Sequence, residues 1–584
     1  MTEKQFRWCV SALIVFAALL AYANTFTNDF VWDDASSIIL HEHVQDPSKF
    51  LRLFMEDQHA FGRGQGNFYR PLVSLSFMIE YWCSRPPAPV EGGMAPLQVL
   101  SPFIFHVSNT FWHALVAVLF FGLLTILDTP RAVRALAPLL YAVHPLHTEA
   151  VAYISGRADS MAAAFLLAAL CCALSMTLKR PALWCGVFFA LALLSKESAL
   201  IFPVVLLCAA VVLRKPREME NGEPKRRSLI SPLVVSGVIL GVYAALRMTV
   251  LRFSDATGTG AAPPFSQRIL DAGQALALYL KLMFVPTGLH MERTLAGVPG
   301  WVAVLGWAMF GLLILLAIGA VVTRKQRLAF ALGFFLITWF PVSGIFPLNA
   351  PMAEHWMYLP MFGFVWALYE LAWLAVGPTP LRYALYAASY AAILVLTLIT
   401  TERNHDWRNN QTIYSATLES NPNSIRVHYN LGVTYEDLIG NLSGARRHFE
   451  EVLALYQQRK IDTGTADVYQ DEMEAHLSLA RIYQRENRPD RAARHYETLR
   501  RLEATDSNAA MLGRTYIEYT RLLLDAGQKD DAAKLLQEGK DRIPALKQQF
   551  DELENRQQNQ NTPTAPDAAK VTVPPQQVQQ PTTE

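Results

Sequence analysis

The sequence has few charges where a soluble enzyme would have many. Its 584 residues hold 51 Lys and Arg against 50 Asp and Glu, so neither sign is in excess to attract nucleic acid or an acidic partner. The first 400 residues carry only 50 of these charges, and residues 401–584 carry the other 51. A front part this long and apolar is too large for one soluble core, which stops growing at roughly 250–300 residues. The composition therefore excludes a soluble enzyme, a basic nucleic-acid binder and a disordered protein.

Cysteines and nucleotide-binding motifs are also scarce. Five of the six cysteines lie inside apolar runs, and only Cys83 is near a polar loop, so the sequence shows no disulfide framework. It contains no G-x-G-x-x-G motif and no P-loop, the usual signs of a nucleotide site. The sequence therefore shows no nucleotide-binding motif of either kind.

Apolar runs of membrane-spanning length fill the first 400 residues. A helix needs about 20 apolar residues to cross a bilayer. The first run follows Lys4 and Arg7 and has no clear cleavage site beyond Ala23, so we predict an uncleaved span with its N-terminus in the cytoplasm. In all we predict eleven spans, at roughly 6–24, 101–127, 132–147, 159–178, 181–195, 198–213, 229–251, 298–323, 327–347, 356–376 and 381–400.

Whether one further apolar run, 272–286, crosses the membrane decides on which side of the membrane every later loop lies. It is short, has Lys281 at its centre and ends in Pro286. Short cytoplasmic loops are enriched in Lys and Arg, and residues 214–227 and 324–327 both stay cytoplasmic only if this run lies at the membrane interface. The tail after residue 400 then emerges opposite the cytoplasm, together with the polar loops at 25–100, 144–160, 195–198, 252–297 and 353–360.

The charged part of the chain repeats a pattern of small and aromatic residues. Positions 7, 8, 11, 20 and 24 of a tetratricopeptide repeat need small residues where two antiparallel helices approach and aromatics in the gap to the next repeat. One copy supplies Leu479, Ala480, Tyr483, Ala492 and Tyr496. A second copy supplies Leu431, Gly432, Tyr435, Ala445 and Phe449. A third, weaker copy supplies Ala532, Leu536 and Pro544.

These patterns predict an all-α protein in three parts. Residues 1–402 form a polytopic membrane bundle, and residues 403–550 form a helical-repeat solenoid. Residues 551–584 are rich in Gln, Pro and Thr, cannot bury a core and are expected to be disordered. Repeat arrays present a concave groove to peptides, so the repeats predict binding of a protein partner.

An adjacent pair of carboxylates, Asp33 and Asp34, follows the first span. Because like charges repel, one of the two is expected to be protonated or paired, and either is a candidate general base. The structural alternative is a helix N-cap, with Asp34 or Ser36 capping a helix that continues through Ile38.

The string HPLHTEAVAYISGRADS holds a cluster of polar residues on the predicted outer face. The spacing of His144, His147 and Glu149 is typical of a divalent metal site, but Pro145 argues against a regular helix presenting all three. No second cluster completes a ligand set, so a divalent metal stays the less favoured of two interpretations. The alternative is a hydrogen-bonded network that binds phosphate, and it also includes Arg157 and Asp159.

Other ionisable residues stand at the predicted ends of spans. At membrane depth such residues are costly and are usually functional or paired with one another. The candidates for binding an anionic group such as a phosphate, or for pairing with one another, are Arg70, Lys196, Glu197, Glu354, His355 and Tyr358. Arg70 has a plain alternative, in which its stem lies along apolar surface and its head reaches the lipid headgroups.

Taken in order, several strings in the sequence resemble the transmembrane-and-TPR O-mannosyltransferase family, a branch of the GT-C glycosyltransferases. They are VWDDAS, FYRPLVSLSF, FHVSNTFWHALVAVLF, YAVHPLHTEAVAYISGRADSMAA, LLSKES and AEHWMYLP, followed by the repeats. The resemblance implies a GT-C membrane bundle with an extracytoplasmic active site, and Asp33 in preference to Asp34 as catalytic base. Animal members have longer repeat arrays, so this chain looks more like a bacterial relative.

The family resemblance also implies a reaction. A polyprenyl-phosphate sugar, carrying mannose or a similar hexose, would donate to Ser or Thr hydroxyls of extracytoplasmic proteins held in the repeat groove. The enzyme would lie in membrane lipid, in a bacterial inner membrane with its repeats in the periplasm. The alternative from another class is a non-enzymatic membrane scaffold whose repeats assemble an envelope complex.

Overall fold

The computed structural model divides the chain into two compact units, Met1–Ala416 and Thr417–Glu584. It describes residues 1–584 except 62–66, 85–99, 214–217, 221–222, 226–227, 254–262, 464–467, 506–507 and 561–584. The sequence predicted the boundary at residue 402, but the structure places residues 403–416 with the first unit. The expected disorder at 551–584 lies mostly outside the described residues, and the segment up to Gln560 is helical.

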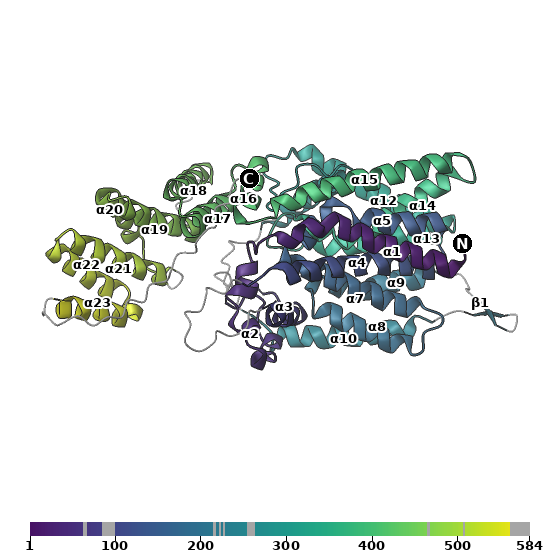
Figure 1. The fold of residues 1–584 in the computed structure, drawn as a ribbon, viewed down its shortest axis with the longest axis horizontal. Coiled ribbons are helices and arrows are strands. Elements are labelled where there is room, and N and C mark those ends of the chain that lie inside the picture. The colour runs from purple at the N-terminus through teal and green to yellow at the C-terminus, as the bar shows by residue number, and fades with distance from the viewer. Residues whose placement is uncertain are drawn as a thin grey trace, which may run out of the picture. The chain divides into compact units, whose positions relative to one another are not determined.

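The first unit is a bundle of helices (Figure 1). Its helices are α1 (Glu3–Tyr22), α2 (Glu42–Gln45), α3 (Pro71–Ser84), α4 (Phe103–Ile126), α5 (Arg131–Ala142), α6 (Thr148–Val151), α7 (Arg157–Leu174), α8 (Pro181–Leu193), α9 (Phe202–Val212), α10 (Ile230–Met248), α11 (Phe265–Phe284), α12 (Gly300–Val322), α13 (Gln326–Trp339), α14 (Pro360–Val376) and α15 (Leu381–Asp406), with α16 (Asn410–Ser420) running across the division.

Short helical turns and one hairpin complete this unit. The turns are η1 (Ala23–Thr27), η2 (Ala35–Ile39), η3 (Pro47–Lys49), η4 (Arg52–Phe54), η5 (Pro145–His147), η6 (Ile154–Gly156), η7 (Glu197–Ile201), η8 (Phe340–Val342) and η9 (Glu354–Met357). The hairpin pairs β1 (Glu218–Glu220) with β2 (Glu223–Lys225), antiparallel, in the loop between α9 and α10.

Among the residues that the structure describes, six helices are long and apolar enough to cross a membrane: Glu3–Thr27, Phe103–Ile126, Ile154–Leu174, Ile230–Met248, Gly300–Val322 and Leu381–Asp406. Four shorter apolar helices, Pro181–Leu193, Glu197–Val212, Gln326–Val342 and Pro360–Val376, fall on four other predicted spans. The remaining predicted span, 132–147, is occupied by α5 and η5. A helix therefore stands at every predicted position, and the count of eleven stays a prediction because five are shorter than a full crossing needs.

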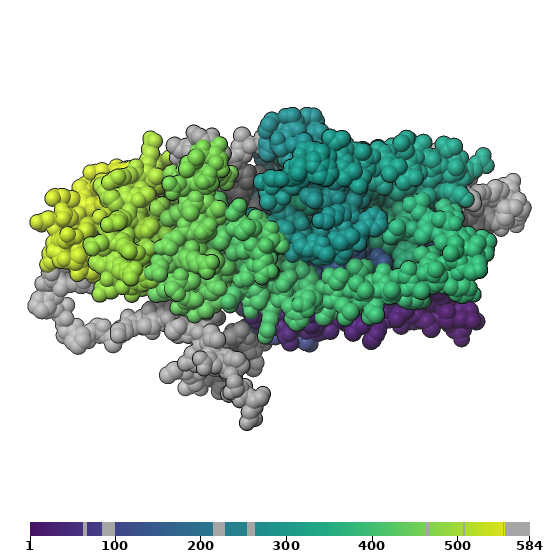
Figure 2. Space-filling view, turned by 90° about the horizontal axis from the view of Figure 1, so that it is seen from above, coloured from purple at the N-terminus to yellow at the C-terminus, as the bar shows by residue number. Residues whose placement is uncertain are grey.

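The first and last helices of the bundle, α1 and α15, lie side by side (Figures 1 and 2). Three asparagines join their ends: Asn24 donates to the Thr401 carbonyl at 2.8 Å, and Asn28 donates to the Asn404 carbonyl at 3.2 Å. Asn404 in turn donates to the Ala21 carbonyl at 2.8 Å. Because these amides are buried or half-buried, each bond satisfies groups that would otherwise cost free energy. We call Asn24, Asn28 and Asn404 the α1–α15 clamp.

The run predicted to lie at the interface forms α11, which packs on α12 through two glycines. A Cβ atom built on Gly306 would lie 1.8 Å from the carbonyl oxygen of Gly273, so the two backbones are in direct contact. Any larger residue at Gly306 would force the helices apart. Helix α11 is not among the helices long and apolar enough to span, and Lys281 on it is exposed.

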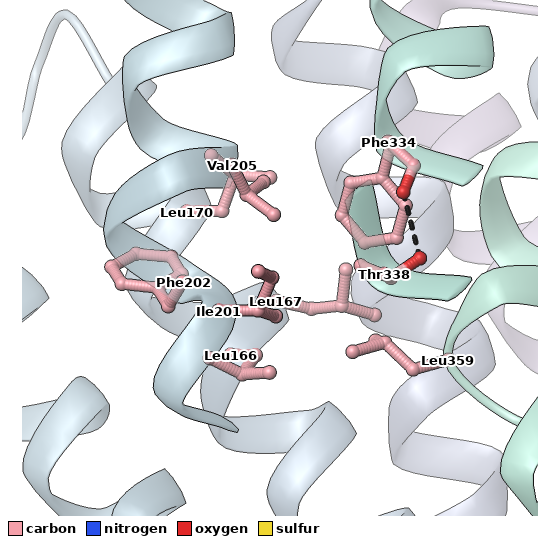
Figure 3. A pocket seen from close by; sticks show the side chains of 9 residues that line it. All are labelled: Leu166, Leu167, Leu170, Ile201, Phe202, Val205, Phe334, Thr338 and Leu359. Carbon is pink, nitrogen blue, oxygen red and sulfur yellow. Dashed lines mark hydrogen bonds between the residues drawn. The ribbon is translucent and has the colours of Figure 1, made fainter. Parts of the chain in front are cut away.

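The interior of the bundle is closely packed. Figure 3 shows nine side chains around a cavity of about 10 Å³ between α7, α9 and α13. All are apolar except Thr338, whose hydroxyl donates to the Phe334 carbonyl at 2.7 Å and so needs no ligand. This small gap is a packing feature, comparable to the space of one water molecule, and it has no chemistry of its own.

The second unit stacks antiparallel helix pairs, as the repeat pattern predicts. Its elements are α17 (Ile425–Val433) with η10 (Thr434–Ile439), α18 (Leu442–Thr463), α19 (Gln470–Arg485), α20 (Pro489–Arg500), α21 (Ala509–Asp525), α22 (Lys529–Arg542), η11 (Pro544–Leu546) and α23 (Lys547–Gln560). A Cβ on Gly432 would lie 2.8 Å from the Phe449 ring, which explains the need for a small residue there. Ala480 and Ala492 are fully buried for the same reason.

Two equivalent histidine pairs join the helices within successive repeats. The Nδ1 atoms of His428 and His448 are 3.0 Å apart, and those of His476 and His495 are 2.8 Å apart. Tyr435 stacks on His448, and the equivalent tyrosine of the next repeat stacks on His495. A pair at this distance shares one proton, so it can hold at most one positive charge without breaking.

We expect the repeats to loosen as the pH falls. Burial lowers the pKa of His448 and of His476 to about 4, against about 6.5 for an unperturbed histidine. The unfolded chain therefore binds protons first, and stability present above pH 6.5 is lost as the pH falls toward 4. The protection of backbone amides in α17–α20 of the full chain against hydrogen exchange, corrected for the intrinsic dependence of exchange on pH, should be roughly two- to tenfold weaker at pH 5 than at pH 7. A His448→Gln, His476→Gln variant should respond less, and an equal response would disprove the assignment.

Candidate active site

The two adjacent carboxylates have different surroundings. Asp34 is fully buried, and its Oδ1 accepts hydrogen bonds from the Ser155 amide at 2.8 Å and the Ser155 hydroxyl at 2.6 Å. Its Oδ2 accepts from the Val31 amide at 3.0 Å. Burial raises the pKa of Asp34 to about 7. The Asp34 side chain forms no hydrogen bond with the backbone of η2, so it does not cap that helix. Its bonds to Ser155 instead connect the first loop to η6.

Asp33 is only half-buried and faces a polar neighbourhood. None of the residues that the structure describes is hydrogen-bonded to its carboxylate, while its carbonyl accepts from Ser36 and Ser37. The preceding residue, Trp32, has a φ of 50°, in the left-handed region that costs a bulky side chain of order 1–3 kcal/mol. A half-buried carboxylate beside a strained residue is the arrangement expected of a general base that must remain available.

A histidine from the same loop lies beside Asp33. The Nδ1 atom of His59 is 3.1 Å from the Ser36 hydroxyl and 3.2 Å from the Ser37 hydroxyl. Its amide donates to Asp57 at 2.7 Å. Burial lowers the pKa of His59, while the charge of Asp33 acts in the opposite direction.

Two of the predicted anion-binding cations are paired with carboxylates near this loop. Arg70 donates to Glu197 at 3.2 Å, and Glu197 also accepts from the Tyr69 amide at 3.0 Å. Lys196 donates to Asp159 at 2.6 Å. Burial lowers the pKa of Lys196, opposed by the charge of Asp159. The structure therefore brings Arg70, Lys196, Glu197 and Asp159 together as neighbouring pairs at the ends of α3, α7 and α8.

Arg157 occupies a different place from the one the sequence suggested. It is fully buried and donates to Glu80 and Asn109, each at 2.6 Å, to Ser76 at 3.0 Å and to the Phe105 carbonyl at 2.8 Å. These partners come from α3 and α4, so the guanidinium joins three helices. This arrangement leaves Arg157 no exposed surface with which to meet a phosphate.

The HPLHTE segment likewise turns its histidines inward. His144 accepts from the Leu146 amide at 3.2 Å through Nδ1 and donates to the Met283 carbonyl at 3.1 Å through Nε2. His147 is fully buried, 4.2 Å between ring centroids from Tyr141. Across the described residues, no group of three His, Cys, Asp or Glu side chains is arranged to hold a metal ion. The metal interpretation of His144, His147 and Glu149 therefore finds no support in the geometry.

Glu149 and Glu354 bind basic side chains from distant parts of the chain. The Glu149 carboxylate is 2.9 Å from His355 Nδ1 and accepts from the His355 amide at 2.9 Å. Burial acts to raise the pKa of Glu149, but the imidazole and amide of His355 outweigh it and hold the pKa below its usual range. Glu354 is bound by Arg293 at 2.6 Å and lies 3.9 Å from Arg403.

Tyr358, the last predicted donor-binding residue, is a core residue. It is fully buried, its hydroxyl is 2.7 Å from His113 Nδ1, and its carbonyl accepts from Tyr141 at 2.8 Å. The structure thus separates the predicted residues into two groups. One group forms ion pairs or lies in the first loop, whereas the other is buried in the bundle. The first group is Arg70 with Glu197, Lys196 with Asp159, Glu149 with His355, Glu354, and the half-buried Asp33; the second is Arg157, His144, His147 and Tyr358.

An aromatic stack joins the first loop to the end of α15. Tyr153 is stacked between Trp32 and Trp407, with ring centroids 5.5 and 5.4 Å apart and interplanar angles of 22°. The Trp32 amide donates to Asn410 at 2.8 Å. Because Tyr153 lies between Glu149 and Ser155 in sequence, one short segment carries the partner of His355, a stacked ring and the residue that binds Asp34.

Several residues of the site could not be recognised from the sequence. His59, Asp57, Ser155 and Arg403 were not predicted, although each contacts or neighbours a predicted residue. No motif marked His59, because its partners Ser36 and Ser37 lie more than twenty residues away. Ser155 could have been suspected from the sequence, because it lies in the same polar string as Arg157 and Asp159.

Residues 475–510, in the second unit, match the model of one protein family, the tetratricopeptide repeat. Over a much longer stretch, the chain is 25% identical to protein O-mannosyl-transferase TMTC3 of Mus musculus across 529 residues, 83% of this chain and 54% of that protein. The chain resembles protein O-mannosyl-transferases. It is also 27% identical to TMTC4 of Homo sapiens over 501 residues, 74% of this chain and 64% of that protein, and 25% identical to F38B6.6 of Caenorhabditis elegans over 447 residues, 73% of this chain and 60% of that protein.

The chain spans about half the length of the TMTC3 protein that it matches. No solved structure matches it. The similarity to these transferases agrees with the resemblance carried by the motifs, and the repeat match agrees with the predicted repeats. The relatives are animal proteins, so a bacterial source for this chain stays a prediction.

Proposed function

We propose that this protein is a membrane glycosyltransferase of the GT-C type that transfers mannose or a similar hexose from a polyprenyl-phosphate donor to Ser or Thr hydroxyls of proteins. The observation that carries the proposal is the contrast within the acidic pair. Asp34 is buried and bound by Ser155, and it holds Asp33 half-buried in a strained loop at the outer ends of the helices. Similarity to protein O-mannosyl-transferases over 83% of the chain supports the reaction class.

The proposed chemistry assigns each group a step. The acceptor hydroxyl attacks the anomeric carbon, the bond from that carbon to the phosphate oxygen breaks, and the hydroxyl proton passes to the Asp33 carboxylate. The leaving group is the polyprenyl phosphate, which departs with the electron pair of that bond. In this proposal Arg70 and Lys196, which pair with Glu197 and Asp159, stabilise the charge of the phosphate. The repeats would present the acceptor on the extracytoplasmic side.

The test is transfer by the purified full chain. Polyprenyl-phosphate mannose and Ser/Thr-rich peptides would be supplied in detergent, with products identified by mass spectrometry. We expect hexose on peptide hydroxyls. If no polyprenyl-phosphate hexose is transferred while the chain still binds envelope proteins, the alternative function of a non-enzymatic scaffold replaces this one.

Arg70 should affect donor binding more than turnover. An Arg70→Gln variant loses a charged hydrogen-bond donor, and such bonds contribute about 1.5–3 kcal/mol, so we expect KM for the donor to rise roughly 10–100-fold with a smaller change in kcat. Initial rates at varied donor concentration would measure both. Arg52→Gln, an exposed arginine of the same loop, is the matched control. An unchanged KM would leave Arg70 with only its structural pairing to Glu197.

A further inference from the structure

An apolar groove of about 580 Å³ lies between α11, α12, α13 and α14. Leu280, Phe284, Trp301, Leu312, Phe335 and Leu368 are among the residues that line it. The side facing outward is open, since Phe284 is 60% and Trp301 is 65% exposed. Helix α12 is long and apolar enough to cross a membrane and buries little of its surface, so the groove opens toward lipid hydrocarbon.

Lys281 is the one charged residue among the described residues that line this groove. It is exposed, and no described side chain forms an ion pair or hydrogen bond with its ammonium group. An ionisable group at the edge of the bilayer is costly unless it is paired or reaches the headgroups. Trp301, at the start of α12, lines the same groove, and tryptophan is enriched at the membrane interface. The groove therefore combines a hydrocarbon channel with an uncompensated positive charge at headgroup level.

Lys281 faces away from the candidate active site. Tyr279 and Met283, two residues before and after it, are about 200° away around the helix, and both are buried against the bundle. Tyr279 donates to the Ala353 carbonyl at 3.0 Å, and the Met283 carbonyl accepts from His144 at 3.1 Å. A lipid held at Lys281 is thus separated from the HPLHTE segment by α11 itself, and its phosphate is not presented to Asp33.

We propose that this groove binds one acyl chain of an anionic phospholipid, with the lipid phosphate on Lys281. The hydrocarbon groove takes the chain, and the charge of Lys281 selects an anionic headgroup over a zwitterionic one. This lipid is a partner of the membrane bundle distinct from the sugar donor. The proposal stands on the groove and on Lys281, and it does not depend on the proposed transferase activity.

The test compares two lipids with identical chains on the full-length protein. Native mass spectrometry would follow binding of dioleoyl-phosphatidylglycerol and dioleoyl-phosphatidylcholine to the purified protein. A lysine near the membrane surface favours anionic lipid by an amount that corresponds to about a fivefold preference. We expect that preference in the wild type and its loss in Lys281→Met. Leu312→Trp, which fills the groove, should reduce binding of both lipids.

Lys325→Met is the matched control, because Lys325 is an exposed lysine beyond the other end of α12. It should keep the preference for phosphatidylglycerol. The proposal is overturned if Lys281→Met also keeps it, or if Leu312→Trp binds lipid as the wild type does. In a third arm, polyprenyl phosphate is added in equal amount; phosphatidylglycerol should stay bound, and its displacement would assign the groove to the donor chain instead.

Discussion

Replacement of Asp33 by Asn is expected to reduce hexose transfer by roughly 10²–10⁴-fold, the usual contribution of a positioned general base. The amide cannot accept the hydroxyl proton, yet it has nearly the shape of the carboxylate. Because no described residue is hydrogen-bonded to the Asp33 carboxylate, the exchange should leave the fold and the donor affinity almost unchanged. Transfer from polyprenyl-phosphate mannose, measured by mass spectrometry beside the thermal unfolding of each variant, separates the two effects.

Two variants of the same loop complete this experiment. Glu42→Gln removes an exposed carboxylate and should keep full activity. Asp34→Asn should lose stability as well as activity, because its amide would face the Val31 amide or the Ser155 donors that now bind a carboxylate. Retained transfer in Asp33→Asn, with a folded protein, would remove Asp33 from the role of base.

Loss of Arg157 should strongly destabilise the membrane bundle. The Arg157→Met variant leaves Glu80 without its cation and Asn109 without its donor in the buried junction of α3, α4 and α7. Removing one partner of a buried ion pair typically costs about 3–5 kcal/mol. Unfolding of the full chain in mixed detergent micelles, followed by circular dichroism, should show a free energy of unfolding lower by about that amount.

An exposed arginine provides the comparison for Arg157. Arg131 pairs with Glu3 near the start of the bundle and is half exposed, so Arg131→Met should change stability by less than about 1 kcal/mol. If Arg157→Met unfolds like the wild type but binds the donor more weakly, Arg157 is a phosphate ligand after all.

Helix positions and repeats could be predicted because both rest on periodic patterns that need no knowledge of distant contacts. The apolar runs correspond to helices at all eleven predicted places, and the small residues at Gly432, Ala480 and Ala492 mark real close approaches. The lengths were harder to predict. Apolar composition alone does not say where a helix ends when proline, as at Pro145, and tertiary contacts interrupt it.

The candidate site was predicted only in part, since residue type does not reveal direction. Asp33 and Asp34 look alike in sequence, and only the bonds from Ser155 distinguish the buried carboxylate from the half-buried one. Arg157 and Arg70 looked equally suited to phosphate, but the partners of Arg157 come from residues 48 to 81 positions away. His59 could not be found at all, because its neighbours join it only through the folded loop.

The α1–α15 clamp has a consequence for how the protein is made. Asn24 and Asn28 bond to Thr401 and Asn404, which leave the ribosome some 376 residues later. The loop with Asp33 also depends on that late segment, through the bond from the Trp32 amide to Asn410. During synthesis the first helix enters the membrane long before its partner exists, so the loop that carries Asp33 can assume its final form only after the last helix of the bundle has been inserted. A nascent chain arrested before α15 would therefore hold an Asp33 carboxylate that is not yet in its final position.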